Sequence, residues 1–204
     1  MAGVAGSVAA GDSAAAVAAA SAAEELPVAG KHGKPILRRL RRIWRHRLAS
    51  TRQVRRTFDA QAFERIENAI AEGETLHRGE VRFAVEAELG LSSLWADTTP
   101  RERALEVFAA QGIWDTEENT GVLIYLLWAD HAVEIIADRV ASRTLPAAQW
   151  QEICTRVAEA CREGHHLDGV LAAVRSVNQA LAAALPARAH EHDQDELPNR
   201  SILL

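Results

Sequence analysis

Oxygen-bearing side chains that could ligate a hard metal ion gather in three short stretches of the chain. They are Asp115, Glu117, Glu118 and Asn119, then Asp130, and then Asp138. Carboxylate and amide oxygens are the ligands that Ca²⁺ and Mg²⁺ take in proteins, and Ca²⁺ needs about six or more of them in place. Two interpretations therefore stay open: a divalent-cation site, or solvated loop carboxylates that hold no ligand.

A second group of carboxylates, Glu86 and Glu88, has strand spacing and shares one face of a predicted strand. At about 3.3 Å per residue the two lie about 7 Å apart, a separation at which an acid–base pair is conceivable. The sequence indicates no partner base and no pocket beside them. We therefore expect a solvated face at the edge of a sheet.

Several familiar catalytic signatures are absent from the sequence. It holds no glycine-rich phosphate loop, no C-x-x-C or H-E-x-x-H metal motif and no G-x-S-x-G nucleophile elbow. Cys154 and Cys161 lie seven residues apart in a predicted helix, about 10 Å along its axis, so they cannot bridge each other. Free buried thiols and the reducing cytoplasm are the expectation.

Charge is distributed unevenly along the chain. Residues 31–56 carry eleven Lys and Arg and no Asp or Glu, which leaves 12 basic residues against 28 acidic ones elsewhere, a balance of −16. Apolar residues recur within this segment at helical spacing, a pattern typical of a basic amphipathic helix. The apolar positions are Ile36, Leu37, Leu40, Ile43, Trp44 and Leu48.

Three interpretations of this basic segment remain open. An anionic membrane surface would account for the apolar positions as well as the charge, at about 1 kcal/mol per basic residue near the lipid. Nucleic acid is disfavoured, because Trp44 is the segment's lone stacking aromatic and no nucleic-acid-binding fold follows. The third is a helix docked on the protein's own acidic body. The residues expected to contact a membrane or another anion are Arg38, Arg41, Arg42, Trp44 and Arg45.

Hydrophobic periodicity predicts the elements that must position these residues. Alternation over residues 80–88 predicts a half-buried strand near an edge, and the apolar run 121–128 predicts a central strand covered on both faces. A helix over residues 100–111 joins them, so the two strands should be parallel with a right-handed crossover. A tight turn should then lead into a third, antiparallel strand over residues 132–138. Flanking helices are expected over residues 59–73, 146–163 and 167–185.

The predicted fold class is α/β: a small mixed β-sheet, made of a βαβ unit and a hairpin, flanked by helices. The antiparallel return places Asp130 at one end of the sheet and Asp138, with the 115–119 loop, at the other. A length of 204 residues suits one domain with appendages. The expected divisions are a disordered Ala-rich tail at 1–30, a basic amphipathic segment at 31–57, the domain at 58–186 and a flexible C-terminal tail at 187–204.

Short motifs resemble the TPM domain family, named for a thylakoid lumen protein, a photosystem II repair protein and a nematode receptor auxiliary subunit. G-E-V-R-F-A-V-E-A at 79–87 is similar to that family's first strand, and N-T-G-V-L-I-Y at 119–125 resembles its hallmark Asn-x-Gly-Val-Leu entry to the second strand. A-V-E-I at 132–135 and D-R at 138–139 match the return strand. The arginine-rich stretch ending in V-R-R-T-F at 54–58 resembles the soluble, anchor-free bacterial branch.

The resemblance implies function as well as fold. It implies an accessory or binding module. The basic segment adds the expectation that this module lies peripherally at the inner membrane face, with an anionic membrane surface or a membrane protein as its partner. The absence of a secretory-signal pattern in residues 1–30 predicts a cytoplasmic protein. The alternative that the resemblance implies is a divalent-metal-dependent phosphatase that uses Ca²⁺ or Mg²⁺. Its ligands would be Asp115, Glu118, Asp130 and Asp138. One departure is that Val140 stands where the family usually has glycine after Asp-Arg, so this turn is expected to follow a different path.

Overall fold

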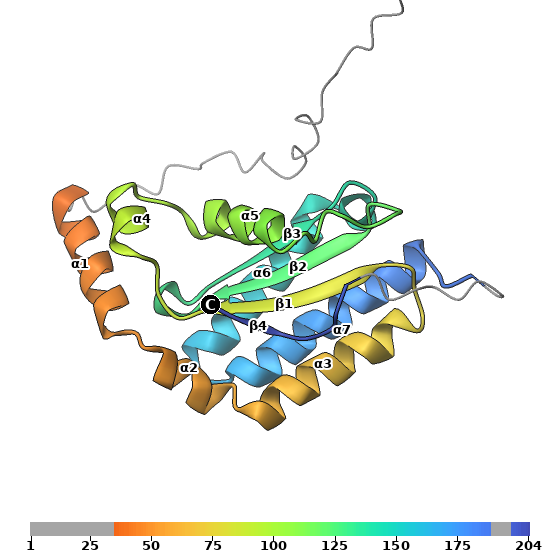
Figure 1. The fold of residues 1–204 in the computed structure, drawn as a ribbon, viewed down its shortest axis with the longest axis horizontal. Helices are drawn as coiled ribbons and strands as arrows, with labels where there is room; N and C mark the ends of the chain where they lie inside the picture. Colours follow the sequence, from red (N-terminus) through yellow and green to blue (C-terminus); the bar gives the residue numbers. More distant parts are fainter. Residues whose placement is uncertain (1–34, 189–196) are drawn as a thin grey trace, which may run out of the picture.

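The computed structural model describes residues 35–188 and 197–204, so the tail predicted at 1–30 lies outside the described residues. A four-stranded sheet lies between two layers of helices, and a basic helix packs at one end (Figure 1). The helices are α1 (Pro35–Leu48), α2 (Thr51–Thr57), α3 (Ala60–Glu74), α4 (Leu91–Trp95), α5 (Pro100–Ala110), α6 (Ala147–Arg162) and α7 (His166–Ala184). The strands are β1 (Glu80–Glu86), β2 (Gly121–Leu127), β3 (Ala132–Ala137) and β4 (Ile202–Leu203).

The sheet has the order β3-β2-β1-β4. β1 pairs parallel with β2 from Glu80↔Gly121 to Glu86↔Leu127, and β2 pairs antiparallel with β3. All seven residues of β2 are buried, as expected of a strand covered on both faces. The predicted mixed sheet of a βαβ unit and a hairpin, flanked by helices, is therefore confirmed.

The C-terminal residues correct two predictions. β4 pairs parallel with β1 through Ala84↔Ile202 and Val85↔Leu203, so β1 is an inner strand and not an edge. Residues 197–204 return to the domain instead of forming a flexible tail: the Ser201 amide donates to Glu67 and the Leu197 amide to Glu80. A run of three apolar residues at 202–204 is too short for periodicity to identify it as a strand.

Hydrophobic cores fill both sides of the sheet. Side chains from α2, α3, α6 and α7 pack on one face, and side chains from α4 and α5 pack on the other (Figure 1). Local sequence signals set the helix starts. Ser50 and Thr99 each form a capping box with the residue three positions later, and Pro100 follows Thr99 as the first residue of α5.

Two further observations bear on the sequence predictions. Val140 follows β3 with φ −78°, in the right-handed helical region, so the turn takes a path open to valine, as expected. Cys154 and Cys161 are both buried free thiols on α6. Among the helices of the described residues, none combines the length and the apolar character needed to cross a bilayer.

Candidate functional site

Asp130 anchors the basic helix α1 to the body of the protein. The residue lies in the short turn Trp128–Asp130 that follows β2, and its side chain is 8% exposed. Arg42 donates to its carboxylate from Nη2 at 2.9 Å and from Nε at 3.1 Å, and Arg45 also pairs with it. The partners lie 85 and 88 positions earlier in the sequence, so only the tertiary fold brings them together.

His46 completes this anchor from within the interface. Its ring is fully buried, and its Nδ1 accepts a hydrogen bond from the backbone amide of Leu89 at 3.0 Å. Because Nδ1 must be the acceptor there, the ring proton lies on Nε2, which donates to Asp130 at 3.1 Å. We call Arg42, Arg45, His46 and Asp130 the α1 anchor.

The electrostatics of the anchor favour an ionised Asp130. Burial alone would raise the pKa of this carboxyl, but the hydrogen bonds from His46 and Arg42 and the charge of Arg42 outweigh burial and hold the pKa well below its ordinary value. Arg42 also donates to the carbonyl of Thr98 at 2.8 Å, and Arg39 lies 3.7 Å from Asp97. One face of α1 is therefore docked on the acidic body, as one of the three interpretations of the basic segment anticipated.

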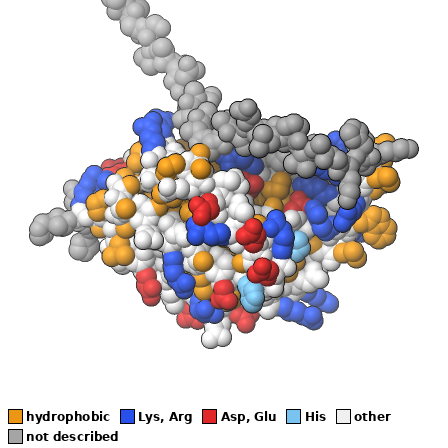
Figure 2. All heavy atoms as spheres, turned by 180° about the vertical axis from the view of Figure 1, so that it is seen from behind, with side chains coloured by type: hydrophobic (Ala, Val, Ile, Leu, Met, Phe, Trp, Pro, Cys, Tyr) orange, Lys and Arg blue, Asp and Glu red, His pale blue; other side chains and the backbone are white. Residues whose placement is uncertain are grey.

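The opposite face of α1 carries large apolar side chains that no described residue covers. At 100° per residue these positions lie across the helix from Arg42 and His46. The exposed fractions are 68% for Ile36, 60% for Leu37, 43% for Leu40, 67% for Trp44 and 71% for Leu48. We call these five residues the apolar stripe. Hydrophobic and basic side chains accordingly gather at the end of the molecule where α1 lies (Figure 2).

The structure divides the five residues expected to contact an anion. Arg42 and Arg45 are engaged in the α1 anchor, and the Arg42 side chain is only 16% exposed. Arg38, Arg41 and Trp44 are exposed. The exposed basic side chains therefore remain available beside the apolar stripe.

The four predicted metal ligands do not converge on one ion. Asp130 follows the end of β2, whereas the Asp138 amide donates to the Gly121 carbonyl at the start of β2. Seven strand residues at about 3.3 Å each separate these two ends by roughly 20 Å. The predicted topology is thus confirmed, and one site cannot include both residues.

Charges around these carboxylates also weigh against a shared metal site. Asp130 is surrounded by the cations of the α1 anchor, and Glu118 pairs with Arg78 and, at 2.7 Å, with Arg188. Asp115 is exposed. Among the residues described, no group of three or more His, Cys, Asp or Glu is arranged to hold a metal ion.

Asp138 has a buried carboxylate oxygen that accepts no hydrogen bond from the described residues. Its Oδ1 accepts from the Arg139 amide at 2.6 Å, while its Oδ2 is buried and without a hydrogen-bond partner among the described residues. The Val140 amide donates to the Asn119 carbonyl, which holds the acidic loop beside this turn. A metal ion at this end of the sheet, which we call the Asp138 rim, could take oxygen ligands from Asp138 and from the 115–119 loop. Metal binding at the Asp138 rim stays a prediction.

Glu86 corrects the expectation of a solvated edge face. Its side chain is buried, accepts from the Tyr125 hydroxyl at 2.6 Å, and pairs with Arg103 at 2.8 Å. Burial, followed by the hydrogen bond to Glu86, raises the pKa of Tyr125 well above its ordinary range. A tyrosine inside an apolar strand needs a partner for its hydroxyl, and that signal could have identified the pair. His46 was missed too, although it lies one helical turn after Arg42.

Comparison with known proteins identifies relatives of this fold. A family model described as TPM domain matches residues 53–180. No curated protein sequence matches the chain. Among solved structures, the NMR structure of the BA42 protein from the psychrophilic bacterium Bizionia argentinensis sp. nov. is similar with a TM-score of 0.61. The two share 24% sequence identity over 71% of this chain and 94% of that one, a likeness that concerns the fold alone.

Proposed function

This chain belongs to the TPM domain family, and from that premise we propose that it is an accessory or binding module that attaches peripherally to an anionic membrane surface. The observation that carries the proposal is the apolar stripe, five large side chains exposed on a helix whose polar face is already anchored to the body. A contiguous exposed apolar surface of this kind marks an interaction site.

Charge favours anionic lipid as the occupant. Arg41 and Arg47 border the stripe on the helix surface, Arg38 is exposed near it, and residues 31–56 contain no acidic residue. An amphipathic helix with this distribution lies in the plane of the interface, with its apolar side chains below the headgroups. Each large apolar side chain that leaves water contributes about 1.5 kcal/mol or more, and each nearby arginine about 1 kcal/mol. The proposed location is the inner face of the cytoplasmic membrane.

Polar substitutions in the stripe should abolish membrane attachment. The full chain is mixed with vesicles that contain phosphatidylcholine with about a third phosphatidylglycerol, and bound protein is measured by co-sedimentation. We expect the double variant Leu40→Ser, Trp44→Ser to bind at least about tenfold more weakly, because it removes about 3 kcal/mol of apolar transfer energy. The matched control is Leu76→Ser, whose side chain is 61% exposed in the turn after α3 and whose loss should leave binding unchanged.

Two further measurements distinguish other occupants of the stripe. Wild-type protein should bind phosphatidylglycerol vesicles far better than pure phosphatidylcholine vesicles, and added salt should weaken the binding. If a second copy of the chain covered the stripe, sedimentation would show a dimer in wild type and a monomer in the double variant. Equal vesicle binding by wild type and the double variant would overturn the membrane proposal.

A divalent-metal-dependent phosphatase is the second candidate function, and the unpartnered Oδ2 of Asp138 is the observation that favours it. A buried carboxylate oxygen without a donor is a plausible ligand for Ca²⁺ or Mg²⁺. Asp138 would hold such an ion with oxygens of the acidic loop, where Asp115 is exposed and Glu118 would have to leave its arginines. The ion would supply charge that stabilises a phosphate ester's oxygens.

Asp138→Asn should remove metal binding if this second candidate is correct. Ca²⁺ is titrated into the full chain while backbone amide resonances are recorded, and the expected shifts lie at residues 115–121 and 138–142. Asp138→Asn should weaken the apparent affinity at least about tenfold, because it removes the charge of the buried ligand. Asp168→Asn, an exposed acid in the first turn of α7, is the control. An apparent Ca²⁺ affinity that is unchanged in Asp138→Asn would contradict this site.

A further inference from the structure

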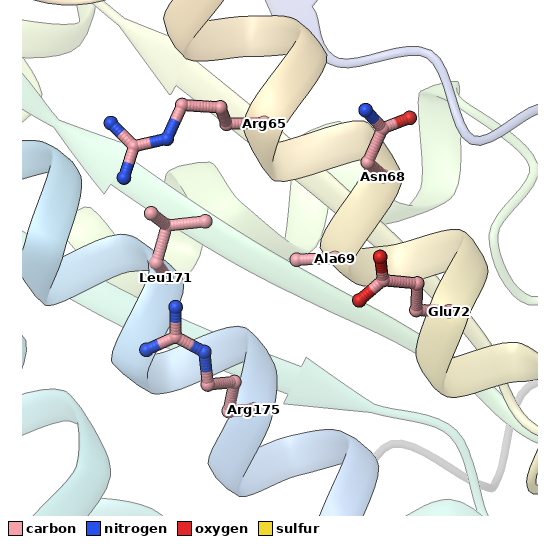
Figure 3. A pocket seen from close by; sticks show the side chains of 6 residues that line it. All are labelled: Arg65, Asn68, Ala69, Glu72, Leu171 and Arg175. Carbon is pink, nitrogen blue, oxygen red and sulfur yellow. The ribbon is translucent and has the colours of Figure 1, made fainter.

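A hollow of about 270 Å³ lies between α3 and α7, away from the α1 anchor and from the Asp138 rim. It is lined by Arg65, Asn68, Ala69 and Glu72 of α3 and by Leu171 and Arg175 of α7 (Figure 3). The two guanidinium groups lie on either side of the Leu171 side chain, each reaching from its own helix (Figure 3). The hollow therefore combines two cations, one carboxylate and one amide with the apolar side chains of Ala69 and Leu171.

Neither arginine has an ion-pair or hydrogen-bond partner within the described residues. Other arginines of the domain, such as Arg78, Arg101 and Arg103, each pair with a carboxylate, whereas these two face the same hollow without one. Two like charges that share a hollow repel each other, and an anion between them would relieve that repulsion. Neither arginine pairs with Glu72, the carboxylate that lines the same hollow, although acidic residues outnumber basic ones in the chain.

We propose that this hollow binds a small organic anion, a carboxylate or phosphate group on an apolar body. Each guanidinium presents a planar fork of donors that matches such an anion, and the Asn68 amide adds a further donor. Leu171 and Ala69 contact the apolar part of the ligand. A volume of about 270 Å³ accommodates a ligand the size of a single ring. The site is independent of the membrane attachment proposed for α1.

Substituting Glu72 should change the affinity for an anion in the opposite direction to substituting either arginine. Glu72 lies two helical turns from Arg65, at the far end of the hollow, so its carboxylate opposes an anion without contacting the guanidinium groups directly (Figure 3). Removing its charge should therefore strengthen anion binding, whereas removing either arginine should weaken it. A nonspecific effect of surface charge would not depend on these three positions.

The experiment titrates phenyl phosphate and benzoate into the full chain and follows the backbone amides of α3 and α7 by NMR, with benzyl alcohol as the neutral analogue. We expect saturable shifts for the two anions and none for the alcohol. Arg65→Ala and Arg175→Ala should each weaken binding at least about fivefold, and Glu72→Gln should tighten it about twofold. Arg143→Ala, an exposed arginine without an ion pair elsewhere on the domain, is the matched control.

Two other outcomes would contradict the anion site. Binding that falls equally in Arg143→Ala, or shifts spread over the whole surface, would show nonspecific attraction and overturn the site. Saturable binding of benzyl alcohol would show an apolar pocket without anion selectivity, which also overturns it. Sedimentation with phosphatidylglycerol vesicles distinguishes a soluble anion from a lipid headgroup as the ligand. Arg65→Ala and Arg175→Ala should bind these vesicles as wild type does. Weaker vesicle binding by either variant would assign the hollow to lipid headgroups instead of a soluble anion.

Discussion

Replacing Asp130 with alanine should lower the free energy of unfolding by about 3 kcal/mol, because it removes the acceptor for the mostly buried Arg42 guanidinium and for the buried His46 imidazole. His46 would keep its hydrogen bond from the Leu89 amide but lose the acceptor for its Nε2. Arg42, whose side chain is only 16% exposed in the wild type, would lose the carboxylate that balances its charge. Chemical denaturation measures the loss. In Asp130→Ala, hydrogen exchange of the α1 amides should be faster than in wild type, and this increase should be larger for α1 than for the strands. The reason is that the α1 anchor holds α1 to the turn after β2.

Two comparisons make the Asp130 prediction specific. Asp115→Ala removes an exposed carboxylate and should change stability by no more than about 0.5 kcal/mol. Asp130→Asn, which keeps one acceptor, should fall between wild type and Asp130→Ala. An unchanged exchange pattern of α1 in Asp130→Ala would contradict the anchor.

The stabilisation by Asp130 should also depend on pH with a definite sign. Its pKa is lowered in the folded protein, so its contribution is complete above the unfolded value of about 3.9 and is lost as the pH falls toward the lower folded value. The difference in unfolding free energy between wild type and Asp130→Ala should therefore be constant from about pH 7 to 5 and shrink below about pH 4. A difference that grew on acidification would contradict the lowered pKa.

Gly121→Ala should destabilise the domain by about 3 kcal/mol or more, because the first residue of β2 has no room for a side chain. A Cβ at this position would lie 1.9 Å from the backbone carbonyl oxygen of Ile113. Ile113 is fully buried and its amide donates to Phe108, so the clash involves backbone that is held in place. To relieve this clash, the backbone at the start of β2 would have to move. The Gly121 carbonyl there also accepts a hydrogen bond from the Asp138 amide. Denaturant unfolding provides the measurement.

Gly90→Ala is the matched control for this substitution. A Cβ at Gly90 would meet only the Ser92 hydroxyl at 3.9 Å, and Gly90 has φ −62°, which alanine adopts readily. Its cost should stay below about 1 kcal/mol, the ordinary effect of alanine at a helix N-cap. If Gly121→Ala cost no more than Gly90→Ala, the steric explanation would be wrong.

The same contact gives a physical reason for the Asn-x-Gly-Val-Leu motif of the TPM domain. Asn119 has φ 57°, a left-handed conformation that asparagine tolerates better than most residues. Two residues later the chain passes against the Ile113 carbonyl, where only glycine fits. The motif therefore marks backbone geometry at the start of β2, and the geometry alone assigns it no catalytic role.

Local chemistry was enough to predict much of this fold. The apolar run over β2 indicated a strand buried on both faces, and Thr99 with Pro100 indicated the start of α5. The helix predicted between the two strands indicated a βαβ crossover, which made the parallel pairing of β1 and β2 the expectation. These predictions succeeded because periodicity and caps depend on residues within a few positions of one another.

The tertiary structure decided everything that depends on distant partners. No local pattern shows that residues 202–203 pair with β1 or that Glu86 accepts a hydrogen bond from Tyr125. Nor does any local pattern show that Arg42 and His46 donate hydrogen bonds to Asp130. Amphipathicity predicted α1 as a helix but not which of its faces meets the domain, and the charged face docked while the apolar one stayed exposed. The physical reason is that hydrophobic spacing reports one element's faces, whereas the choice of partner depends on which charges and backbone groups the folded chain brings within hydrogen-bond distance.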